Sequence, residues 1–477
     1  MKTFDVIIIG AGVTGASLAR ELSRYKLDVC VLEKEEELAF GVSKSNSGII
    51  HPGTQLAASS LKGRLCVQGN ALTRVLARQL GVDFQEVGEL IVAFSEEEIF
   101  HLHRLKEEAL KLKVPGVRMV DQSWLAKNEP NLNPKVRAAL FAPSAGIISP
   151  YRWVYDLAEN ARVNGVEIIT SSKVERIEYS NRRFTVSGNG FSYNSRFLVN
   201  CAGLFADDVS AMAGVSDFRI TPVKGEEFIL DKKLQDLTRH LIFPLPTPQS
   251  KGILVIKTSD GNPMIGPTAQ EAVDKEDLST SEEGLNKVLE GVRKMVPAIS
   301  EKNIIAYFAG LRPKAGDDFI IRSEEKIPGF INVAGIQSPG LTAAPAIALM
   351  VKGLLEKSGL RLHRKFFFRA HRPKTSHLFA MKAEKARELI KKNPEYGDIV
   401  CRCEMVSARE IKEAIARGAV TLDGIKFRTR AQAGRCHGSF CTTRVMKILA
   451  MERGIPLTRI TKRGPGSEIV KDERKDD

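Results

Sequence analysis

The chain opens with an apolar run, a glycine-rich turn and a second apolar segment. The run Val6–Ile9 has the length of a buried strand, and the small residues Gly10–Gly15 follow it directly. Residues 16–22 then continue with helical periodicity, and residues 28–32 form another apolar run that ends at the carboxylate of Glu33. Strand, turn, helix and strand in this order predict a βαβ unit at the N-terminus.

Similar patterns return twice further along the chain, separated by segments of another kind. Residues 216–309 alternate short apolar runs with Pro and Gly, which is typical of a mixed sheet. Helices are expected at 61–80, 95–112 and 282–295, and two short strands around 310–314. The predicted nucleotide-binding segments are about 1–90, 150–215 and 310–355, and the substrate-domain segments about 91–149 and 216–309. We therefore expect an α/β and α+β protein in which a Rossmann-like domain is interleaved with a mixed-sheet domain.

Charge is distributed unevenly over the 477 residues. The net charge is +14, and residues 361–477 hold 28 Lys and Arg against 14 Asp and Glu, so the whole basic excess lies there. Such a segment is typical of contact with an acidic protein, nucleic acid or anionic lipid, and a solvated basic surface is an equal alternative. Residues 356–395 are expected to be a basic linker, and residues 456–477 a charged tail.

Two apolar stretches could be mistaken for targeting or membrane segments. Asp5 and the glycine turn make the N-terminal run a buried strand rather than a signal peptide. Residues 331–351 are long enough to span a bilayer, but Gln337–Gly340 break them into strand, turn and helix. We therefore expect a cytoplasmic protein with no transmembrane segment.

The spacing of Gly10, Gly12 and Gly15 matches the dinucleotide-binding fingerprint. The first glycine permits a tight turn, the second lets the backbone approach a pyrophosphate, and the third allows close packing of helix on strand. The pyrophosphate would bind at the helix N-terminus, where free N–H groups and the helix dipole favour an anion. Glu33, about 20 residues on, is placed to accept a hydrogen bond from the ribose hydroxyl.

Four of the seven cysteines cluster near the C-terminus, whereas Cys30, Cys66 and Cys201 lie in apolar or helical contexts typical of buried thiols. Two residues of the cluster form a CxC pair, 32 residues intervene, and the other two form a Cx4C pair. Four thiolates in two pairs can bind a [2Fe–2S] cluster or zinc, and the spacing alone leaves both open. The predicted metal ligands are Cys401, Cys403, Cys436 and Cys441.

The sequences VCRCE and GRCHGSFC resemble the bacterioferritin-associated-ferredoxin-like [2Fe–2S] domain. The match is to the form of this domain at the end of anaerobic-type glycerol-3-phosphate dehydrogenases. The resemblance implies an iron–sulfur domain over residues 396–455, bound through the four cysteines, and makes zinc the minor alternative. Between the pairs, Ser407 and Glu410 have the spacing of a helix capping box.

The first 355 residues resemble the D-amino-acid-oxidase-type FAD superfamily and the same dehydrogenases. The stretches that carry this resemblance are IIIGAGVTGASLARELSR, SNSGIIHPG, NCAGLFADD, AGLRPKAGDDFII and INVAGIQSPGLTAAPAIALMV. The resemblance implies FAD as a cofactor, with backbone N–H groups of a C-terminal turn at the flavin ring. The candidate FAD-binding residues are Gly10, Gly12, Gly15, Glu33, Lys34, Ser45, Asn46, Ser47, Val174, Ala202, Gly203, Gly340, Leu341 and Thr342.

The candidate catalytic residues are Arg312, His51 and Lys257. Arg312 suits an anionic substrate group because its guanidinium is planar, permanently charged and bidentate. His51 titrates near neutrality and is the candidate base, placed beside the flavin by the family resemblance. Lys257 resembles a substrate-facing lysine of glycerol-3-phosphate oxidases, and Lys314 is a weaker candidate.

Together these features predict the catalytic subunit of a glycerol-3-phosphate-dehydrogenase-like enzyme. Hydride would pass from a secondary alcohol to FAD, and electrons would leave through the [2Fe–2S] cluster to protein subunits that are flavoproteins or quinone-linked. A small anionic substrate, no nucleic acid and peripheral membrane association through a partner are expected. The alternatives are L-2-hydroxyglutarate or another 2-hydroxy or amino acid as substrate, and, remotely, a non-catalytic flavin–zinc module that binds nucleic acid.

Overall fold

The computed structural model describes residues 2–247, 251–372 and 377–471. The chain divides into two compact units. The first comprises residues 1–32, 39–168 and 174–371, and the second comprises residues 33–38, 169–173 and 372–477. Each unit is described here by itself.

The first unit contains an eight-stranded sheet built around the N-terminal strand β1 (Lys2–Ile9). β1 pairs in parallel with β2 (Val29–Leu32) on one side and with β12 (Phe191–Asn200) on the other. The remaining strands are β9 (Glu167–Ile169), β10 (Arg176–Ser180), β11 (Arg183–Gly188), β19 (Ile320–Ser323) and β20 (Phe330–Ala334). Because β1 lies inside this sheet, all four residues of Val6–Ile9 are buried, as the continuous apolar run predicts.

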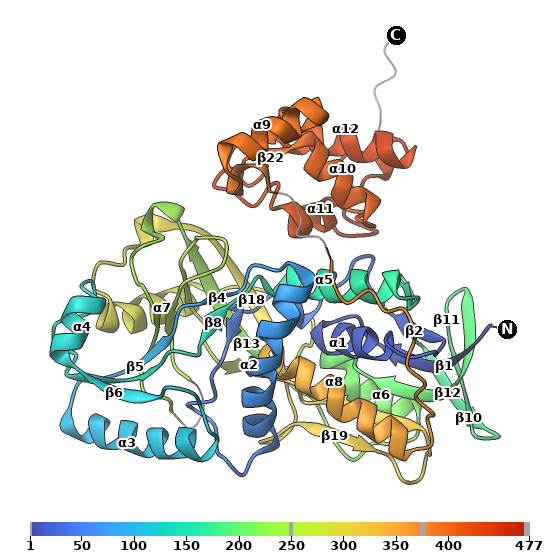
Figure 1. Cartoon of the computed structure of the whole chain (residues 1–477), viewed down its shortest axis with the longest axis horizontal. Coiled ribbons are helices and arrows are strands. Elements are labelled where there is room, and N and C mark those ends of the chain that lie inside the picture. The colour runs from blue at the N-terminus through green and yellow to red at the C-terminus, as the bar shows by residue number, and fades with distance from the viewer. Residues whose placement is uncertain (1, 248–250, 373–376, 472–477) are drawn as a thin grey trace. The chain divides into compact units, whose positions relative to one another are not determined.

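Helices pack around this sheet and against one another (Figure 1). α1 (Val13–Leu22) packs against α5 (Pro150–Val163) and α8 (Gly340–Lys357), and α2 (Leu61–Leu80) packs against α8. Here α2 confirms the helix predicted at 61–80. The short helix α6 (Ala206–Met212) follows β12.

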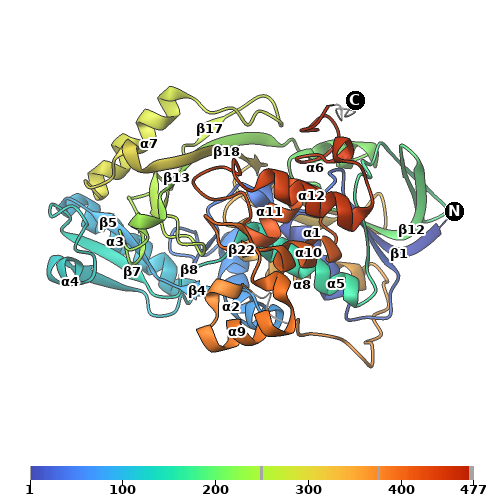
Figure 2. The same ribbon diagram turned by 90° about the horizontal axis from the view of Figure 1, so that it is seen from above.

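The first unit also contains a nine-stranded sheet with helices on both faces. Its strands are β5 (Glu89–Ala93), β6 (Arg118–Asp121), β7 (Ala138–Ala142), β13 (Thr221–Leu230), β14 (Leu241–Phe243), β15 (Leu254–Ile256), β16 (Met264–Gly266), β17 (Gln270–Glu271) and β18 (Ile304–Lys314). α7 (Glu282–Met295), which confirms the helix predicted at 282–295, runs beside β13 and β18 in Figure 2. The helices α3 (Glu96–Lys111) and α4 (Gln122–Asn128) complete this part, with a small sheet of β3 (Ile49–Ile50), β4 (Gln85–Glu86) and β8 (Gly146–Ile147).

Alternate residues of the nine-stranded sheet enter two separate cores. In β5, Leu90 and Val92 join the core that includes Val288 of α7. Ile91 and Ala93 join the other core, which includes Leu102 of α3. Successive side chains of a strand point to opposite faces, so each face of the sheet contributes to one core. Figure 1 shows α7 and α3 on opposite sides of β5, each covering one of these faces.

The two short strands expected around 310–314 are wrong, because these residues lie inside the single long strand β18. β18 pairs with β13 in antiparallel register from Thr221–Lys314 to Leu230–Ile304. Gly310 and Pro313 suggested a break in the sequence, but Pro313 lies opposite Pro222 and both are accommodated in the ladder. Continuous pairing with a long neighbour overrides the local turn signal.

The second unit is built mainly from short helices around its own apolar core. Its elements are α9 (Ala383–Lys392), β21 (Ile399–Cys401), β22 (Val406–Ser407), α10 (Ala408–Ala416), α11 (Leu422–Thr429) and α12 (Thr442–Arg453). The core contains Ile411, Ile425, Val445 and Leu449. The capping box predicted at Ser407 and Glu410 is confirmed, since both reciprocal hydrogen bonds are present. Among the described residues, no helix combines the length and the apolarity that crossing a bilayer requires.

Two helical glycines give opposite expectations for the same substitution. A Cβ added to Gly69 in α2 would lie 2.0 Å from the Thr342 carbonyl oxygen of α8, whereas a Cβ on Gly353 in α8 meets nothing within 4 Å. We expect Gly69→Ala to destabilise the protein by separating the two helices. Gly353→Ala should stabilise it by about 0.5–1 kcal/mol, because alanine loses less backbone entropy in a helix. Thermal unfolding of the holoprotein measures both changes, and equal shifts would contradict the packing described.

Candidate functional site

The glycine fingerprint forms a cradle at the start of α1 that side chains would fill. Gly10 has φ of +101°, and a Cβ there would lie 2.5 Å from the Cys201 carbonyl oxygen. A Cβ on Gly15 would lie 2.0 Å from the Gly10 carbonyl oxygen, so the third glycine allows helix and turn to touch. Gly12 caps α1, and a Cβ there would meet only Ser43 Oγ, at 3.2 Å. The cradle therefore fits a pyrophosphate at the N-terminus of α1.

The loop that contains Ser45, Asn46 and Ser47 is held by its own hydrogen bonds. Asn46 Nδ2 donates to the Ser43 carbonyl at 2.6 Å, and Asn46 Oδ1 accepts from the Gly48 N–H at 2.9 Å. Ser47 Oγ donates to Glu227 Oε1 at 2.8 Å. This last bond joins the predicted flavin loop to strand β13 of the nine-stranded sheet.

Five other predicted FAD-binding residues lie in two turns. Gly340 begins α8, followed by Leu341 and the fully buried Thr342. Ala202 donates its N–H to Asn200 Oδ1 at 3.2 Å, and Gly203 has φ of +61°. Both follow directly on β12, as expected for residues beside a nucleotide at the carboxyl ends of parallel strands.

For the last three predicted FAD-binding residues, Glu33, Lys34 and Val174, the structure gives positions and contacts but does not test cofactor binding. Glu33 follows β2 in sequence, is 9 % exposed, and its Oε1 accepts from the Glu35 N–H at 3.1 Å. Lys34 forms an ion pair with Glu35 at 3.3 Å. Glu33 and Lys34 belong to the second compact unit, whereas Val174 is a buried residue of the first. The roles of these three residues in FAD binding stay predictions.

His51 is fixed by contacts with α8 and α2. Its N–H donates to Thr342 Oγ1 at 2.9 Å, and its carbonyl accepts from Asn70 Nδ2 at 3.0 Å. Nε2 lies 3.5 Å from Ser338 Oγ, just before the turn that starts α8. Burial, with a further contribution from the charge of Lys251, holds the pKa of His51 well below its usual range. The imidazole is therefore neutral at physiological pH and can accept a proton.

Arg312 lies on β18, and Gly225 of the neighbouring strand makes room for its side chain. Gly225 of β13 pairs directly with Gly310 of β18, and Val223 pairs with Arg312. A Cβ on Gly225 would lie 2.5 Å from an Arg312 terminal nitrogen, so the guanidinium folds back over the glycine. One terminal nitrogen donates to the Thr268 carbonyl at 2.7 Å. Burial lowers the pKa of Arg312, although the arginine keeps its charge.

Glu227 is a buried carboxyl on the same strand pair. It is 4 % exposed, and burial raises its pKa to about 7, although the hydroxyl of Ser47 and the charge of Arg312 oppose this. Oε2 makes no hydrogen bond within the described part of the chain. A carboxyl that is half protonated near neutrality neutralises Arg312 only in part. Sequence reasoning missed Glu227, since a glutamate in an ordinary strand gives no local signal.

Of the lysines, Lys251 rather than Lys257 is electrostatically coupled to this site. Lys251 lies just before β15; burial lowers its pKa, and the charge of Arg312 lowers it further. Lys257 follows β15 and forms no hydrogen bond or ion pair with other described residues. Lys314 forms a surface ion pair with Glu271 at 3.0 Å. The sequence signal for Lys251 was a lysine at the entry of an apolar strand, which is too common to single out.

The four C-terminal cysteines come together as two pairs in the second unit. Cys403 Sγ and Cys436 Sγ lie 3.5 Å apart, and the thiol of Cys441 is hydrogen-bonded to Cys401. Cys401 and Cys441 are each 1 % exposed, whereas Cys403 is exposed. No group of three or more His, Cys, Asp or Glu within the described ranges is arranged around one point for a single metal ion. Two pairs match the two thiolates that each iron of a [2Fe–2S] cluster takes.

Backbone N–H groups point at these sulfurs and stabilise thiolates. The hydrogen bond from Cys441, together with backbone N–H groups of Gln432 and Glu404, lowers the pKa of Cys401 to about 6. Burial works against ionisation of Cys436, but its pKa is lowered overall by the N–H groups of Gly438 and Phe440 and the thiol of Cys403. Such a donor set fits an anionic iron–sulfur cluster, which also accepts N–H bonds at sulfur.

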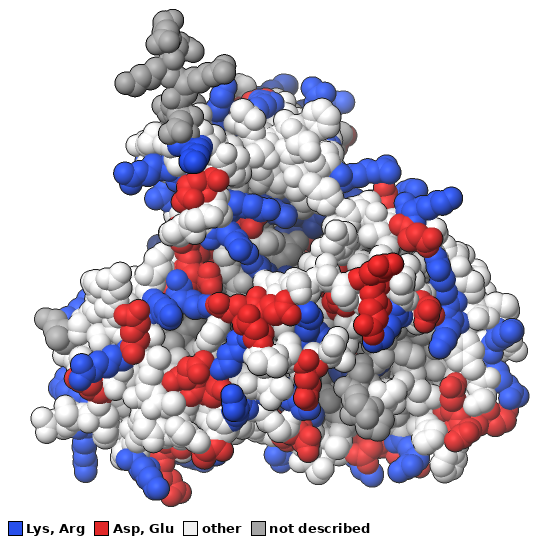
Figure 3. Space-filling view, turned by 180° about the vertical axis from the view of Figure 1, so that it is seen from behind, with Lys and Arg blue, Asp and Glu red and all other residues white. Residues whose placement is uncertain are grey.

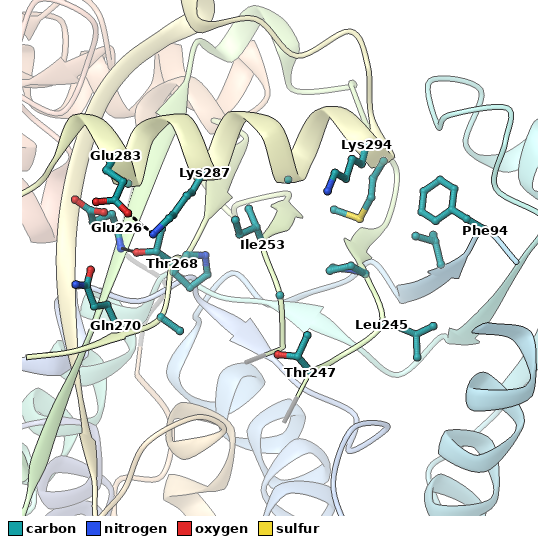
Figure 4. A pocket seen from close by; sticks show the side chains of 18 of the residues that line it. Phe94, Glu226, Leu245, Thr247, Ile253, Thr268, Gln270, Glu283, Lys287 and Lys294 are labelled. Atoms are coloured by element: carbon teal, nitrogen blue, oxygen red, sulfur yellow. Dashed lines mark hydrogen bonds and ion pairs between the residues drawn. The ribbon is translucent and has the colours of Figure 1, made fainter. Parts of the chain in front are cut away.

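A cavity of about 680 Å³ opens in the first unit between α7 and residues of β5, β13 and β17 in the nine-stranded sheet (Figure 4). Its lining contains none of the predicted site residues. Lys287 and Glu283 form an ion pair with each other at 2.5 Å, and Glu226 accepts a hydrogen bond from Ser281 Oγ at 3.1 Å. The cavity lining adjoins the candidate site at Thr268, whose carbonyl accepts the hydrogen bond from Arg312.

A glycine cradle at the end of a parallel strand, with a partly buried histidine and arginine in the same unit, fits the class of FAD-dependent oxidoreductases. Comparison with known families gives the same result. The family model described as FAD dependent oxidoreductase matches residues 5–354, and that of the BFD-like [2Fe–2S] binding domain matches residues 399–451. The chain belongs to the FAD-dependent oxidoreductase family and carries a [2Fe–2S]-binding domain. The predicted fold class and both cofactors, FAD and a [2Fe–2S] cluster, are confirmed.

Individual relatives agree with this assignment. The chain is 41% identical over 470 residues to a glycerol 3-phosphate dehydrogenase of Caloramator mitchellensis, covering 98% of each chain. The FAD-bound structure of dithionite-reduced L-alpha-glycerophosphate oxidase from Mycoplasma pneumoniae has a TM-score of 0.74 and 32% identity, covering 78% of this chain and 99% of that one. Mitochondrial L-2-hydroxyglutarate dehydrogenase of Homo sapiens is 29% identical over 409 residues, covering 73% of this chain and 88% of its own length.

The coupling of Lys251 to His51 predicts a shift in the pH profile of flavin reduction. Because the positive charge of Lys251 lowers the pKa of His51, Lys251→Met should raise that pKa. His51 would then be protonated up to a higher pH, so the acid limb of kcat/KM moves upward in pH. Stopped-flow flavin reduction across pH measures it, with Lys314→Met as control. An unmoved limb, or a shift to lower pH, would refute the coupling.

Proposed function

We propose that this protein is the catalytic subunit of an enzyme that oxidises glycerol 3-phosphate at its secondary hydroxyl. The observation that carries the proposal is the combination of a desolvated histidine, His51, with the partly buried cations Arg312 and Lys251. The glycerol 3-phosphate dehydrogenase that is 41% identical over almost the whole chain supports the substrate. A secondary alcohol beside a phosphate needs a proton acceptor and an anion site, and these side chains supply both.

His51 is the proposed acceptor of the hydroxyl proton. Its Nε2 is the ring nitrogen next to Ser338, and its main chain is fixed by Thr342, so the ring is positioned from both sides. Because the imidazole is already neutral, its unprotonated nitrogen can accept the hydroxyl proton directly, with no earlier deprotonation of the ring. FAD, when bound in the glycine cradle, supplies the acceptor for the hydride.

Arg312 and Lys251 are the proposed ligands of the substrate phosphate. Among the described residues, neither forms an ion pair with a carboxylate, although burial acts on both. Unpaired buried cations are costly, and an anionic ligand removes that cost. Glu227 does not satisfy Arg312 fully, because burial raises its pKa to about 7.

The [2Fe–2S] cluster, when bound by its four cysteines, supplies one-electron transfer from the flavin to an external acceptor. We infer that the acceptor is a protein subunit, since an oxidase that uses oxygen needs no such exit. A cytoplasmic location is part of the proposal and is supported by the three cysteines outside the cluster, Cys30, Cys66 and Cys201, which are unpaired thiols of the kind that a reducing compartment maintains.

Anaerobic bleaching of the flavin identifies the substrate. Glycerol 3-phosphate should reduce the flavin, whereas L-2-hydroxyglutarate, L-lactate and L-proline should reduce it poorly or not at all. Arg312→Ala should raise the KM for glycerol 3-phosphate by the equivalent of about 2–4 kcal/mol, because a buried ion pair is truncated. Lys314→Ala, on the same strand but at the surface, is the matched control. Efficient bleaching by L-2-hydroxyglutarate alone would replace the proposed substrate.

Removal of one cluster ligand separates flavin chemistry from electron exit. Reduction by substrate or dithionite should give the EPR signal of one [2Fe–2S] cluster per chain. Cys436→Ser should abolish that signal and leave bleaching of FAD by substrate unchanged, because the cluster ligands and the substrate site belong to different units. Bound zinc in place of iron, or a loss of FAD bleaching in the variant, would contradict this division.

A further inference from the structure

Two adjacent phenylalanines on the first unit are almost fully exposed and have no role in the proposed chemistry. Phe366 and Phe367 are 90% and 84% exposed, although both belong to a well-anchored segment. Their rings contact each other at 4.8 Å between centroids and 81° between planes, so they form a single apolar knob. Large apolar side chains exposed together mark an interaction site. We name residues 360–371 the strap.

The strap is fixed by hydrogen bonds on both sides of the knob. Before it, the Lys26 N–H donates to the His363 carbonyl at 2.8 Å, and the Lys365 N–H donates to the Arg24 carbonyl at 2.9 Å. After it, the Arg369 N–H donates to Asn164 Oδ1 at 2.9 Å. Phe366 and Phe367 are therefore held outward by the backbone and do not extend from a loose chain.

Unlike Phe366 and Phe367, the neighbouring Phe368 packs against the first unit. Its ring packs under the guanidinium groups of Arg20 and Arg24, at 5.8 and 5.2 Å from the ring centroid. One phenylalanine of three thus anchors the strap to the first unit. The other two face away from it.

The strap itself carries charges of one sign. Residues 360–371 contain four Lys and Arg and no Asp or Glu. Asp28 lies beside Lys365 and Glu21 beside Arg364, but Arg361 and Arg369 are exposed and form no ion pair with other described residues. Over most of the face in Figure 3, by contrast, Lys and Arg alternate with Asp and Glu.

We propose that the strap binds an anionic lipid surface, with Phe366 and Phe367 inserted among the headgroups and the surrounding Lys and Arg facing lipid phosphates. Aromatic and apolar side chains on a basic face are the composition of segments that lie in a membrane interface. A fluid bilayer also accepts a protruding knob without a complementary pocket, which a protein partner would have to provide. The substrate site and cluster ligands take no part in this contact.

Vesicle flotation of the full-length holoenzyme tests the proposal. The probes are vesicles of phosphatidylcholine alone and of phosphatidylcholine with about one-third phosphatidylglycerol. The protein should float with the anionic vesicles at low salt and much less with the neutral ones, and binding should weaken at about 0.5 M salt. No binding to the anionic vesicles at low salt would overturn the proposal.

Variants assign the contact to the strap. Phe366→Ser and Phe367→Ser should each reduce partitioning about tenfold or more, and Arg361→Gln and Arg369→Gln about fivefold each. Phe100→Ser is the matched control, because Phe100 is 64% exposed on α3 beside the acidic first turn of that helix. Undiminished binding of both Phe variants would overturn the assignment. Unchanged bleaching by glycerol 3-phosphate shows that the variants are folded and separates this test from that of the proposed function.

Insertion itself is measured with Phe367→Trp. The new indole should shift its emission to shorter wavelength with anionic vesicles and be quenched by brominated lipids. The wild-type protein, whose Trp153 is buried and Trp124 half-buried, reports the background. If brominated lipids leave the emission unchanged, insertion is excluded. If Phe366→Ser alters the mass of the protein in solution and not vesicle binding, the knob is a protein interface and the proposal fails.

Discussion

The flavin-binding part of the fold depends on backbone contacts so close that no side chain can lie between them. Gly10 and Gly15 approach the Cys201 and Gly10 carbonyl oxygens, Gly69 approaches that of Thr342, and Gly310 approaches that of Ser45. The Gly15 contact closes the fingerprint turn itself, whereas the other three join distant segments: the fingerprint with the end of β12, α2 with α8, and β18 with the serine loop. The approach of these backbone segments is limited by steric exclusion, because a single added Cβ would push the two segments apart.

Burial then decides the charge state of the groups at that site. It favours neutral His51 and partly protonated Glu227, whereas Arg312 stays charged because guanidinium is too basic to lose its proton. The protein's own carboxylate thus compensates this cation only in part, and an anion brought by the substrate can do so. The same desolvation that makes the site costly to form suits the anionic substrate that we propose for it.

Features that depend on residues close together in the sequence were predicted correctly. Features that depend on contacts between distant parts of the chain were not. The fingerprint glycines, the helix α7 and the capping box at Ser407 each depend on spacing within one element, and the structure has them where expected. The continuous strand β18 was missed because its partner β13 lies about 80 residues away and overrides a Gly-Leu-Arg-Pro turn signal. Lys251 and Glu227 were missed for the same reason, since only the folded sheet brings them near His51 and Arg312.

The position of β1 between β2 and β12 has a consequence for biosynthesis. β2 emerges from the ribosome soon after β1, but β12 follows only after about 180 further residues, and its neighbour β20 later still. The apolar edge formed by Val6–Ile9 therefore stays unpaired while more than a third of the 477 residues are synthesised. An open apolar strand edge is prone to pair with other chains. Slow synthesis or truncation before β12 would expose nascent chains to aggregation, and chaperones that bind extended apolar segments would be needed most at the start of the sequence.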